Sequence, residues 1–410
     1  MKKLLIIGFV WPEPNATAAG SRMLQLIELF QQKGYSITFA STASKTPTMF
    51  NLENIHIKTV SIELNNASFD LFITKLNPDI VLFDRYLTEE QFGWRVSENC
   101  PKAIRILDTE DLHFLRNARK TALKNNTKVS NSELMNEMAK REIASIFRCD
   151  LTLIISKYEM KLLKKVFKIP KTILQYVPFL MNSISSETIN SYPSFENRSH
   201  FMTMGNFRHE PNWDAVLQLK NNIWPLIRKQ LPSAEMHVYG AYVSEKALQL
   251  HNKKEGFLVK GWANSTENIF KNSKVCLAPL RFGAGLKGKL IDAMKYGTPS
   301  VTTSIGAEAM HKKLSWNGYI CDNPTDFATK AIKLYSNKIE WEKAQENGAI
   351  ILNKCFSKTK YGNKLQDKIM LLEENLENHR LNNFMGSLLM HHTLKSTKFL
   401  AKWIEEKNKK

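Results

Sequence analysis

The segment that decides the fold spans residues 278–310 and reads APLRFGAGLKGKLIDAMKYGTPSVTTSIGAEAM. It begins where a short apolar run stops at Pro279, a pattern typical of a buried parallel strand that ends at one edge of a sheet. From Leu286, apolar residues recur at helical spacing until Gly297 ends the helix. Residues 300–304 form a short stretch rich in β-branched side chains, so the segment is predicted to be strand, loop, helix and strand.

The loop between this strand and this helix has the composition of an anion site. Gly283 and Gly285 allow backbone N–H groups to approach a ligand, and the N-terminus of the following helix points at the loop. Lys287 adds a full positive charge beside the helix dipole, and Asp292 is placed so that its carboxylate can reach ribose hydroxyls. We therefore expect this loop to hold the diphosphate of a nucleotide, chiefly through the backbone N–H groups of residues 283–287.

The sequence IDAMKYGTPSVTTSIGAEAM within this segment resembles the nucleotide-sugar-binding stretch of the GT-B glycosyltransferases, in particular the retaining family 4, or glycosyl transferases group 1. The sequences MGNFRHEPNWDAV and IWPLIRKQLPSAEMHVYG extend the resemblance over nearly all of residues 200–375, and it is fainter before them. The resemblance implies a metal-independent, hexosyltransferase-like enzyme. Such an enzyme moves a sugar from a nucleoside-diphosphate sugar to a glycan or lipid-linked acceptor with retention, in cell-surface polysaccharide or glycolipid biosynthesis.

This chain departs from the family pattern at two places. The family carries two acids separated by seven residues; here Asp292 stands at the second place, implied to hold ribose, and Ala284 stands at the first. The first acid is implied to contact the donor sugar near its reacting carbon, a role that Glu308 could take over. Many relatives also grip the diphosphate with an Arg and a Lys where this chain has Asn206 and Pro211. The expected nucleotide-sugar site comprises Arg208, Arg281, Gly283, Ala284, Gly285, Leu286, Lys287, Asp292 and Glu308.

The beginning of the chain is expected to form the acceptor side of the site. Residues 2–9 predict a first strand, and a proline-containing loop leads through Gly20 and Arg22 into an amphipathic helix. The resembling transferases open in the same order, which implies that Gly20 and Arg22 line the acceptor side. Further strands of this domain are predicted at residues 36–40, 55–62, 79–84, 103–108 and 150–155.

Residues 108–113, with the sequence DTEDLH, directly follow one of these strands. Ligands of doubly wound sheets bind beyond the carboxyl ends of the strands. A helix N-cap with acids on its first turn explains the acids without any function. Relatives present a histidine or an acid toward the donor sugar from a comparable place, which implies a sugar contact for His113. The candidate catalytic residues are His113 and Lys287, the latter because it would hold charge that grows on the leaving diphosphate.

The alternation of strands and helices predicts the α/β class, with two Rossmann-like, doubly wound parallel-sheet domains facing a cleft and a C-terminal helical tail. At 410 residues the chain is longer than one hydrophobic core usually supports. The expected parts are an acceptor-side domain at residues 1–177, a linker at 178–199, a nucleotide-sugar-binding domain at 200–355, a crossover helix at 356–378 and a basic amphipathic tail at 379–410.

The formal charge of +19 is concentrated in residues 112–132, in residues 157–171 and in the tail. Solvated helix faces are one interpretation of such regions, and an anionic membrane surface is the other. Nucleic acid is not expected, because no zinc-finger, RRM-like or helix-turn-helix signature occurs. For the tail, a helix docked on the protein and an interfacial membrane helix are both open.

The five scattered cysteines are typical of reduced core thiols, and the sequence has no run of 18 apolar residues. No Cys/His cluster or HExxH pattern is present, so we expect no metal and no cofactor beyond the donor substrate. These features suggest a cytoplasmic protein, peripheral on the membrane. Two rival functions remain: a nucleotide-sugar 2-epimerase of the same fold, and, because of Ala284, a catalytically silent nucleotide-sugar-binding protein.

Overall fold

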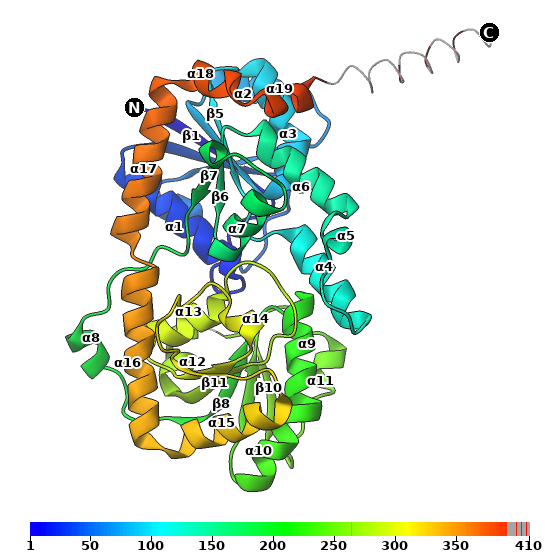
Figure 1. Cartoon of the computed structure of the whole chain (residues 1–410). Coiled ribbons are helices and arrows are strands. Elements are labelled where there is room, and N and C mark those ends of the chain that lie inside the picture. The colour runs from blue at the N-terminus through cyan, green and yellow to red at the C-terminus, as the bar shows by residue number, and fades with distance from the viewer. Residues whose placement is uncertain (264, 392–398, 400–402, 404–406, 408–410) are drawn as a thin grey trace.

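The computed structural model describes residues 1–263, 265–391, 399, 403 and 407, and it contains two parallel sheets (Figure 1). The first sheet has the strand order β3-β2-β1-β4-β5-β6-β7. Its strands are β1 (Lys3–Gly8), β2 (Ser36–Ser41), β3 (Lys58–Ser61), β4 (Ile80–Asp84), β5 (Ile104–Asp108), β6 (Leu151–Ile154) and β7 (Leu174–Tyr176). The helices between them are α1 (Ala18–Gln32), α2 (Ser68–Leu76), α3 (Arg85–Asn99), α4 (His113–Lys124), α5 (Asn131–Leu134), α6 (Glu137–Arg148) and α7 (Lys157–Lys165).

Both faces of the first sheet are buried, which explains the continuous apolar runs in its central strands, such as residues 4–7 of β1 and 80–83 of β4. In β1, Leu5 and Ile7 pack on one face among residues of α2, α3 and α4. Leu4 and Ile6 pack on the opposite face, against α1 and against the later helix α17 (Lys358–Glu374). The sheet is therefore covered by helices on both sides, as the doubly wound arrangement requires.

The second sheet has the order β10-β9-β8-β11-β12-β13 and is also parallel throughout. Its strands are β8 (Ser199–Met204), β9 (Met236–Tyr239), β10 (Phe257–Gly261), β11 (Ser273–Ala278), β12 (Ser300–Thr302) and β13 (Gly318–Ile320). Its helices are α9 (Glu210–Gln218), α10 (Trp224–Gln230), α11 (Glu245–Leu248), α12 (Thr266–Asn272), α13 (Gly288–Lys295), α14 (Ser304–Ala307), α15 (Pro324–Ser336) and α16 (Lys338–Cys355). The expected α/β class with two doubly wound parallel sheets is confirmed.

The chain passes twice between the two sheets. The first passage contains the short helix α8 (Ser186–Asn190), and the second lies between α16 on the second sheet and α17 on the first (Figure 1). The two passages are hydrogen-bonded to each other: Met181 N–H donates to the Phe356 carbonyl at 2.8 Å, and Lys358 N–H donates to the Met181 carbonyl at 2.9 Å.

The start of the expected basic tail docks on the first domain. Here α18 (Leu376–Leu381) leads into α19 (Phe384–Met390), which lies beside α6, and Asn383 donates from its side-chain amide to the Phe147 carbonyl at 2.7 Å. Arg380 forms an ion pair with the buried Asp150 at 2.8 Å. The expected apolar tail positions Leu394, Leu400 and Ile404 lie outside the described residues. In the part of the chain that the structure describes, no helix combines the length and the apolar character needed to cross a bilayer.

Two strands differ from the sequence prediction. The strand expected at residues 55–62 is limited to β3, because residues Leu52–Ile55 form a 3-10 turn that ends at His56, whose φ is 60°. The three-residue edge strand β7 was not predicted, since three residues carry no measurable alternation of apolar and polar side chains.

A buried ion pair holds the centre of the first domain. The Arg22 guanidinium on α1 donates to both carboxylate oxygens of Asp108 at the end of β5, with Nη2 2.8 Å from Oδ1 and Nε 3.0 Å from Oδ2. Arg22 Nη1 also donates to the Val177 carbonyl at 2.7 Å. The pair thus joins the first helix, a central strand and the segment where the chain leaves the domain.

We expect Asp108→Ala to lower the free energy of unfolding by about 3–5 kcal/mol, because it leaves the Arg22 charge buried without a partner. Urea denaturation followed by circular dichroism measures the loss. The double variant Arg22→Met, Asp108→Leu removes both charges and should recover most of the stability. A single variant as stable as the wild type would show that the pair does not hold the domain together.

Candidate functional site

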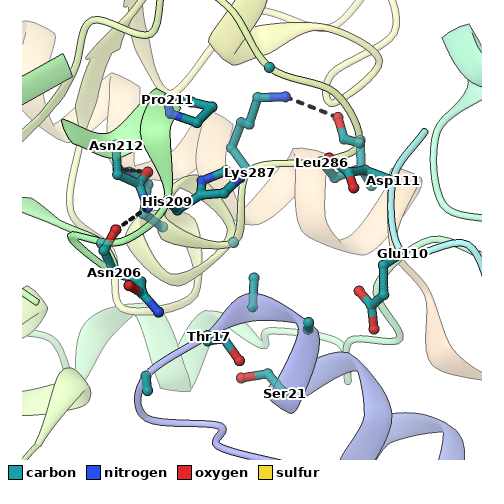
Figure 2. Close-up of a pocket in the computed structure, with 18 of the residues that line it drawn as sticks. Thr17, Ser21, Glu110, Asp111, Asn206, His209, Pro211, Asn212, Leu286 and Lys287 are labelled. Carbon is teal, nitrogen blue, oxygen red and sulfur yellow. Dashed lines mark hydrogen bonds between the residues drawn. The ribbon is translucent and has the colours of Figure 1, made fainter. Parts of the chain in front are cut away.

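A cavity of about 450 Å³ lies where the carboxyl ends of the two sheets face each other. Its wall includes residues that directly follow strands of both sheets: Phe9, Arg85, Glu110, Ile155, Gly205, Gly240, Ala263 and Leu280. Figure 2 shows Thr17, Ser21 and Glu110 of the first domain across this space from Asn206 and His209 of the second, and Asp111 beside Leu286 of the glycine loop. This is the position in which doubly wound sheets bind ligands.

The glycine loop predicted from the sequence forms part of the wall and is held by the first domain. Gly283 and Gly285 have φ values of 145° and 63°, which side-chain-bearing residues rarely adopt. A Cβ atom on Gly285 would lie 2.8 Å from the Cβ of Asp111, so only glycine fits there. The Gly285 N–H donates to Glu159 Oε1 at 2.7 Å. Contrary to expectation, this N–H group is therefore already bonded and does not belong to a free anion cradle.

Two lysines at the start of α13 line the cavity. Lys287 precedes the first residue of the helix, and its Nζ donates to the carbonyls of Ala284 and Gly285 at 2.9 and 3.1 Å. Lys289, which the sequence analysis missed, donates from Nζ to Asn212 Oδ1 at 2.9 Å. Burial lowers the pKa of each lysine to about 8. Both still carry charge at neutral pH, and no ion pair to either is present among the described residues.

Asp292 lies on the second turn of the same helix and also lines the cavity. Burial raises the pKa of its carboxyl to about 6. The carboxylate can accept hydrogen bonds from a ligand hydroxyl pair such as a ribose diol. Lys289 precedes Asp292 by three residues, and this spacing could have pointed to Lys289, because helix residues three or four apart share a face.

The first-domain wall carries the charged Asp111 and the neutral His113 side by side. Burial raises the pKa of Asp111, but the nearby Arg116 and His113 outweigh burial and hold that pKa below its usual range. Burial lowers the pKa of His113 to about 4, so its imidazole is neutral at pH 7 although Nε2 lies 3.4 Å from Asp111 Oδ1. Burial lowers the pKa of His209, on the opposite wall, to about 4 as well.

Three residues of the expected nucleotide-sugar site lie away from the cavity wall. Arg208 is exposed, and its guanidinium lies over the ring of a tyrosine at 4.1 Å. Arg281 is paired with Asp214. Glu308 accepts hydrogen bonds from Arg119 of the first domain at 2.7 and 2.8 Å, and thus bridges the two domains. None of the three lines the cavity, so the structure places them outside it, each in contact with another side chain of the protein.

The two residues expected on the acceptor side are also placed elsewhere. Arg22 is buried in its ion pair, and a Cβ atom on Gly20 would lie 2.5 Å from the backbone of Glu13. The same segment instead presents Thr17 and Ser21 to the cavity (Figure 2). Gly20 is therefore needed for close packing of the loop on the helix, and Arg22 for the domain core.

Residues 198–337 match the protein family described as Glycosyl transferases group 1. Comparison with curated proteins gave no match. Sucrose-phosphate synthase from Thermosynechococcus elongatus is similar in structure, with a TM-score of 0.68, 13% identity and coverage of 91% of this chain and 99% of that chain. Anabaena HepE, solved with UDP and glucose, has a TM-score of 0.65 and 11% identity, and the match covers 90% of this chain and 100% of that chain. The pneumococcal O-GlcNAc transferase GtfA, solved with UDP and GlcNAc, has a TM-score of 0.66 and 11% identity, and the match covers 90% of this chain and 99% of that chain.

The family match and the shared fold agree with the resemblance drawn from the sequence. The solved structures establish the GT-B fold over nearly the whole chain, and the family match gives the second domain its enzyme class. The second domain thus matches a glycosyltransferase family, and the whole chain has the fold of solved glycosyltransferases.

We expect Asp292→Asn to weaken nucleoside diphosphate binding by about 1.5–3 kcal/mol, the contribution of hydrogen bonds to a charged group. The same variant should raise the Tm at pH 7. Between the ordinary pKa of 3.8 and the raised pKa of about 6, the folded state binds more protons at Asp292 than the unfolded state, so stability falls as pH rises through this window. Asparagine removes that loss.

Isothermal titration calorimetry and thermal melts measure the two effects. The matched control is Asp367→Asn, which removes an exposed carboxylate on α17 far from the cavity and should change neither affinity nor Tm. Unchanged affinity in a folded Asp292→Asn variant would contradict the ribose assignment.

Proposed function

We propose that the protein transfers a sugar from a nucleoside-diphosphate sugar to a glycan or lipid-linked acceptor, with retention, in the assembly of a cell-surface polysaccharide or glycolipid. The observation that supports this proposal is the cavity shared by both domains, whose second-domain wall carries two half-buried lysines and Asp292 at the start of α13. The Asp292 carboxylate can accept hydrogen bonds from a diol, and the two lysine ammonium groups can bind a diphosphate.

Lys287 and Lys289 are the groups that meet the charge of the leaving diphosphate. As the glycosidic bond breaks, its electron pair goes to the diphosphate oxygen, and negative charge grows there. Two half-buried cations beside the N-terminus of α13 stabilise that charge more strongly than water does, because the site is preorganised and partly excludes water. We propose that these groups act without a metal or a further cofactor.

In the retaining reaction that we propose, the acceptor hydroxyl attacks from the face that the diphosphate leaves. The new carbon–oxygen bond forms as the old one breaks, and the hydroxyl proton passes to the diphosphate oxygen. His113, neutral at pH 7, lines the first-domain wall of the cavity and can exchange hydrogen bonds with the donor sugar. The first domain, which presents Thr17 and Ser21 to the cavity, receives the acceptor.

A screen of UDP-, GDP- and TDP-linked sugars by thermal shift, followed by turnover assays, tests the proposal. A bound donor at 100 times its Kd stabilises the fold by about 2.7 kcal/mol. We expect release of the nucleoside diphosphate only when an acceptor is present. Consumption of the donor without acceptor would favour the 2-epimerase, and binding without any turnover would favour the silent binding protein.

We also propose that the protein is peripheral on the cytoplasmic face of a membrane, through a basic surface built by α7 and α17. Several lysines lie close together on this surface. Partial loss of solvent around Lys157 lowers its pKa, and the nearby Lys312, Lys360 and Lys364 lower it further. All lysines of residues 157–171 are exposed. By contrast, three of the basic residues in region 112–132, Arg116, Arg119 and Lys120, are neutralised by ion pairs with acidic residues of the protein.

Sedimentation with lipid vesicles tests the membrane proposal. We expect binding to vesicles with anionic lipid and release as salt rises, because charges are screened beyond about 8–10 Å at 0.1–0.15 M. The triple variant Lys161→Glu, Lys164→Glu, Lys364→Glu should lose binding. The control with Glu at Lys246, Lys253 and Lys254, exposed on the second domain, carries the same net charge and should still bind. Equal sedimentation with neutral vesicles would contradict an electrostatic surface.

A further inference from the structure

The cavity contains a carboxyl group that the sequence analysis did not assign. Resting on the proposed function, we propose that Glu110 of the first domain contacts the hydroxyls of the donor sugar, in place of a side chain that Ala284 cannot provide. The residue lines the cavity, and Figure 2 shows its carboxyl group directed into it from the side opposite Asn206.

The backbone places Glu110 beside the glycine loop. It lies between β5 and α4, and its φ of 60° is in the left-handed region. A Cβ atom on Gly285 would lie 3.5 Å from the Glu110 carbonyl and 2.8 Å from the Cβ of Asp111. The loop of the first domain thus packs directly against the residue that follows Ala284, and both Glu110 and Ala284 line the cavity.

The Glu110 carboxyl group is incompletely satisfied within the protein. Its Oε1 atom is buried and has no hydrogen-bond partner among the described residues. A buried polar atom without a partner is costly, at about 1–3 kcal/mol, and in a ligand cavity its natural partner is the ligand. Burial raises the pKa of Glu110 well above its usual value, and Asp108 and Asp84 raise it further against the opposing effect of Arg22 and Arg85. The neutral carboxyl group can donate one hydrogen bond and accept others.

The other carboxylates near the loop have different partners. Glu308 is bonded to Arg119, and Asp111 to Arg116. Asp292 lies on the second turn of α13, beyond the two lysines that we assign to the diphosphate. Glu110 is therefore the carboxyl group that remains for the sugar end of a donor whose diphosphate lies at Lys287 and Lys289.

The test compares Glu110→Ala and Glu110→Gln by calorimetry with a panel of UDP-, GDP- and TDP-hexoses and with each free nucleoside diphosphate. The measured quantity is the ratio of the Kd of the diphosphate to the Kd of its sugar conjugate. We expect Glu110→Ala to lower this ratio about tenfold, the effect of one to two hydrogen bonds, with the Kd of the diphosphate unchanged. Glu110→Gln, which keeps a donor and an acceptor, should retain most of the ratio.

Two controls separate this inference from other outcomes. Lys289→Ala should weaken the diphosphate and the conjugate alike and leave the ratio unchanged. Glu110→Gly tests folding, because glycine adopts the left-handed backbone freely and should keep or raise the Tm while lowering the ratio like alanine.

An unchanged ratio in Glu110→Ala, or an equal loss for diphosphate and conjugate, would overturn the role of Glu110 and leave the proposed function in place. Failure of the wild type to bind any member of the panel or any free diphosphate would instead overturn the proposed function, and the role of Glu110 with it.

Discussion

The site depends on one carboxylate that is hydrogen-bonded to both domains. Glu159 Oε1 accepts the N–H of Leu112 at 3.1 Å and the N–H of Gly285 at 2.7 Å. The loop after β5 and the glycine loop are therefore fixed against each other, and the residues between them form one cavity. An N–H group left buried without this acceptor would cost about 1–3 kcal/mol. Burial raises the pKa of Glu159 to about 7, so near neutral pH this contact between domains is close to its titration point.

Two further contacts hold the same arrangement at the edges of the cavity. Arg119 of α4 donates to the Gly283 carbonyl at 2.7 Å and pairs with Glu308. On the other side, the Tyr242 hydroxyl donates to Glu13 Oε2 at 2.7 Å. Charged and polar side chains thus connect the domains around a cavity whose wall carries Lys287, Lys289 and Asp292. The residues that hold the two domains together here, Arg119, Glu308, Tyr242 and Glu13, do not line the cavity.

The sequence predicted most of the fold because the central strands are buried on both faces, and runs such as residues 4–7 are apolar throughout. It also located the glycine loop, Lys287 and Asp292, all of which line the cavity. Long-range pairs could not be predicted. Arg22 and Asp108 are 86 residues apart and Arg119 and Glu308 are 189 apart, so nothing local marks these charges as partners. The role expected of Arg22 and Glu308 changed for that reason.

The pair of hydrogen bonds between the two chain passages limits how the domains can move. Met181 lies between the Phe356 carbonyl and the Lys358 N–H, so the two passages form one ribbon rather than two separate tethers. A ribbon bends about a single line and resists shear along it. Any change in the angle between the domains must therefore bend both passages at the same place. The two passages act as one connection at this point, because the backbone of Met181 is hydrogen-bonded to both Phe356 and Lys358.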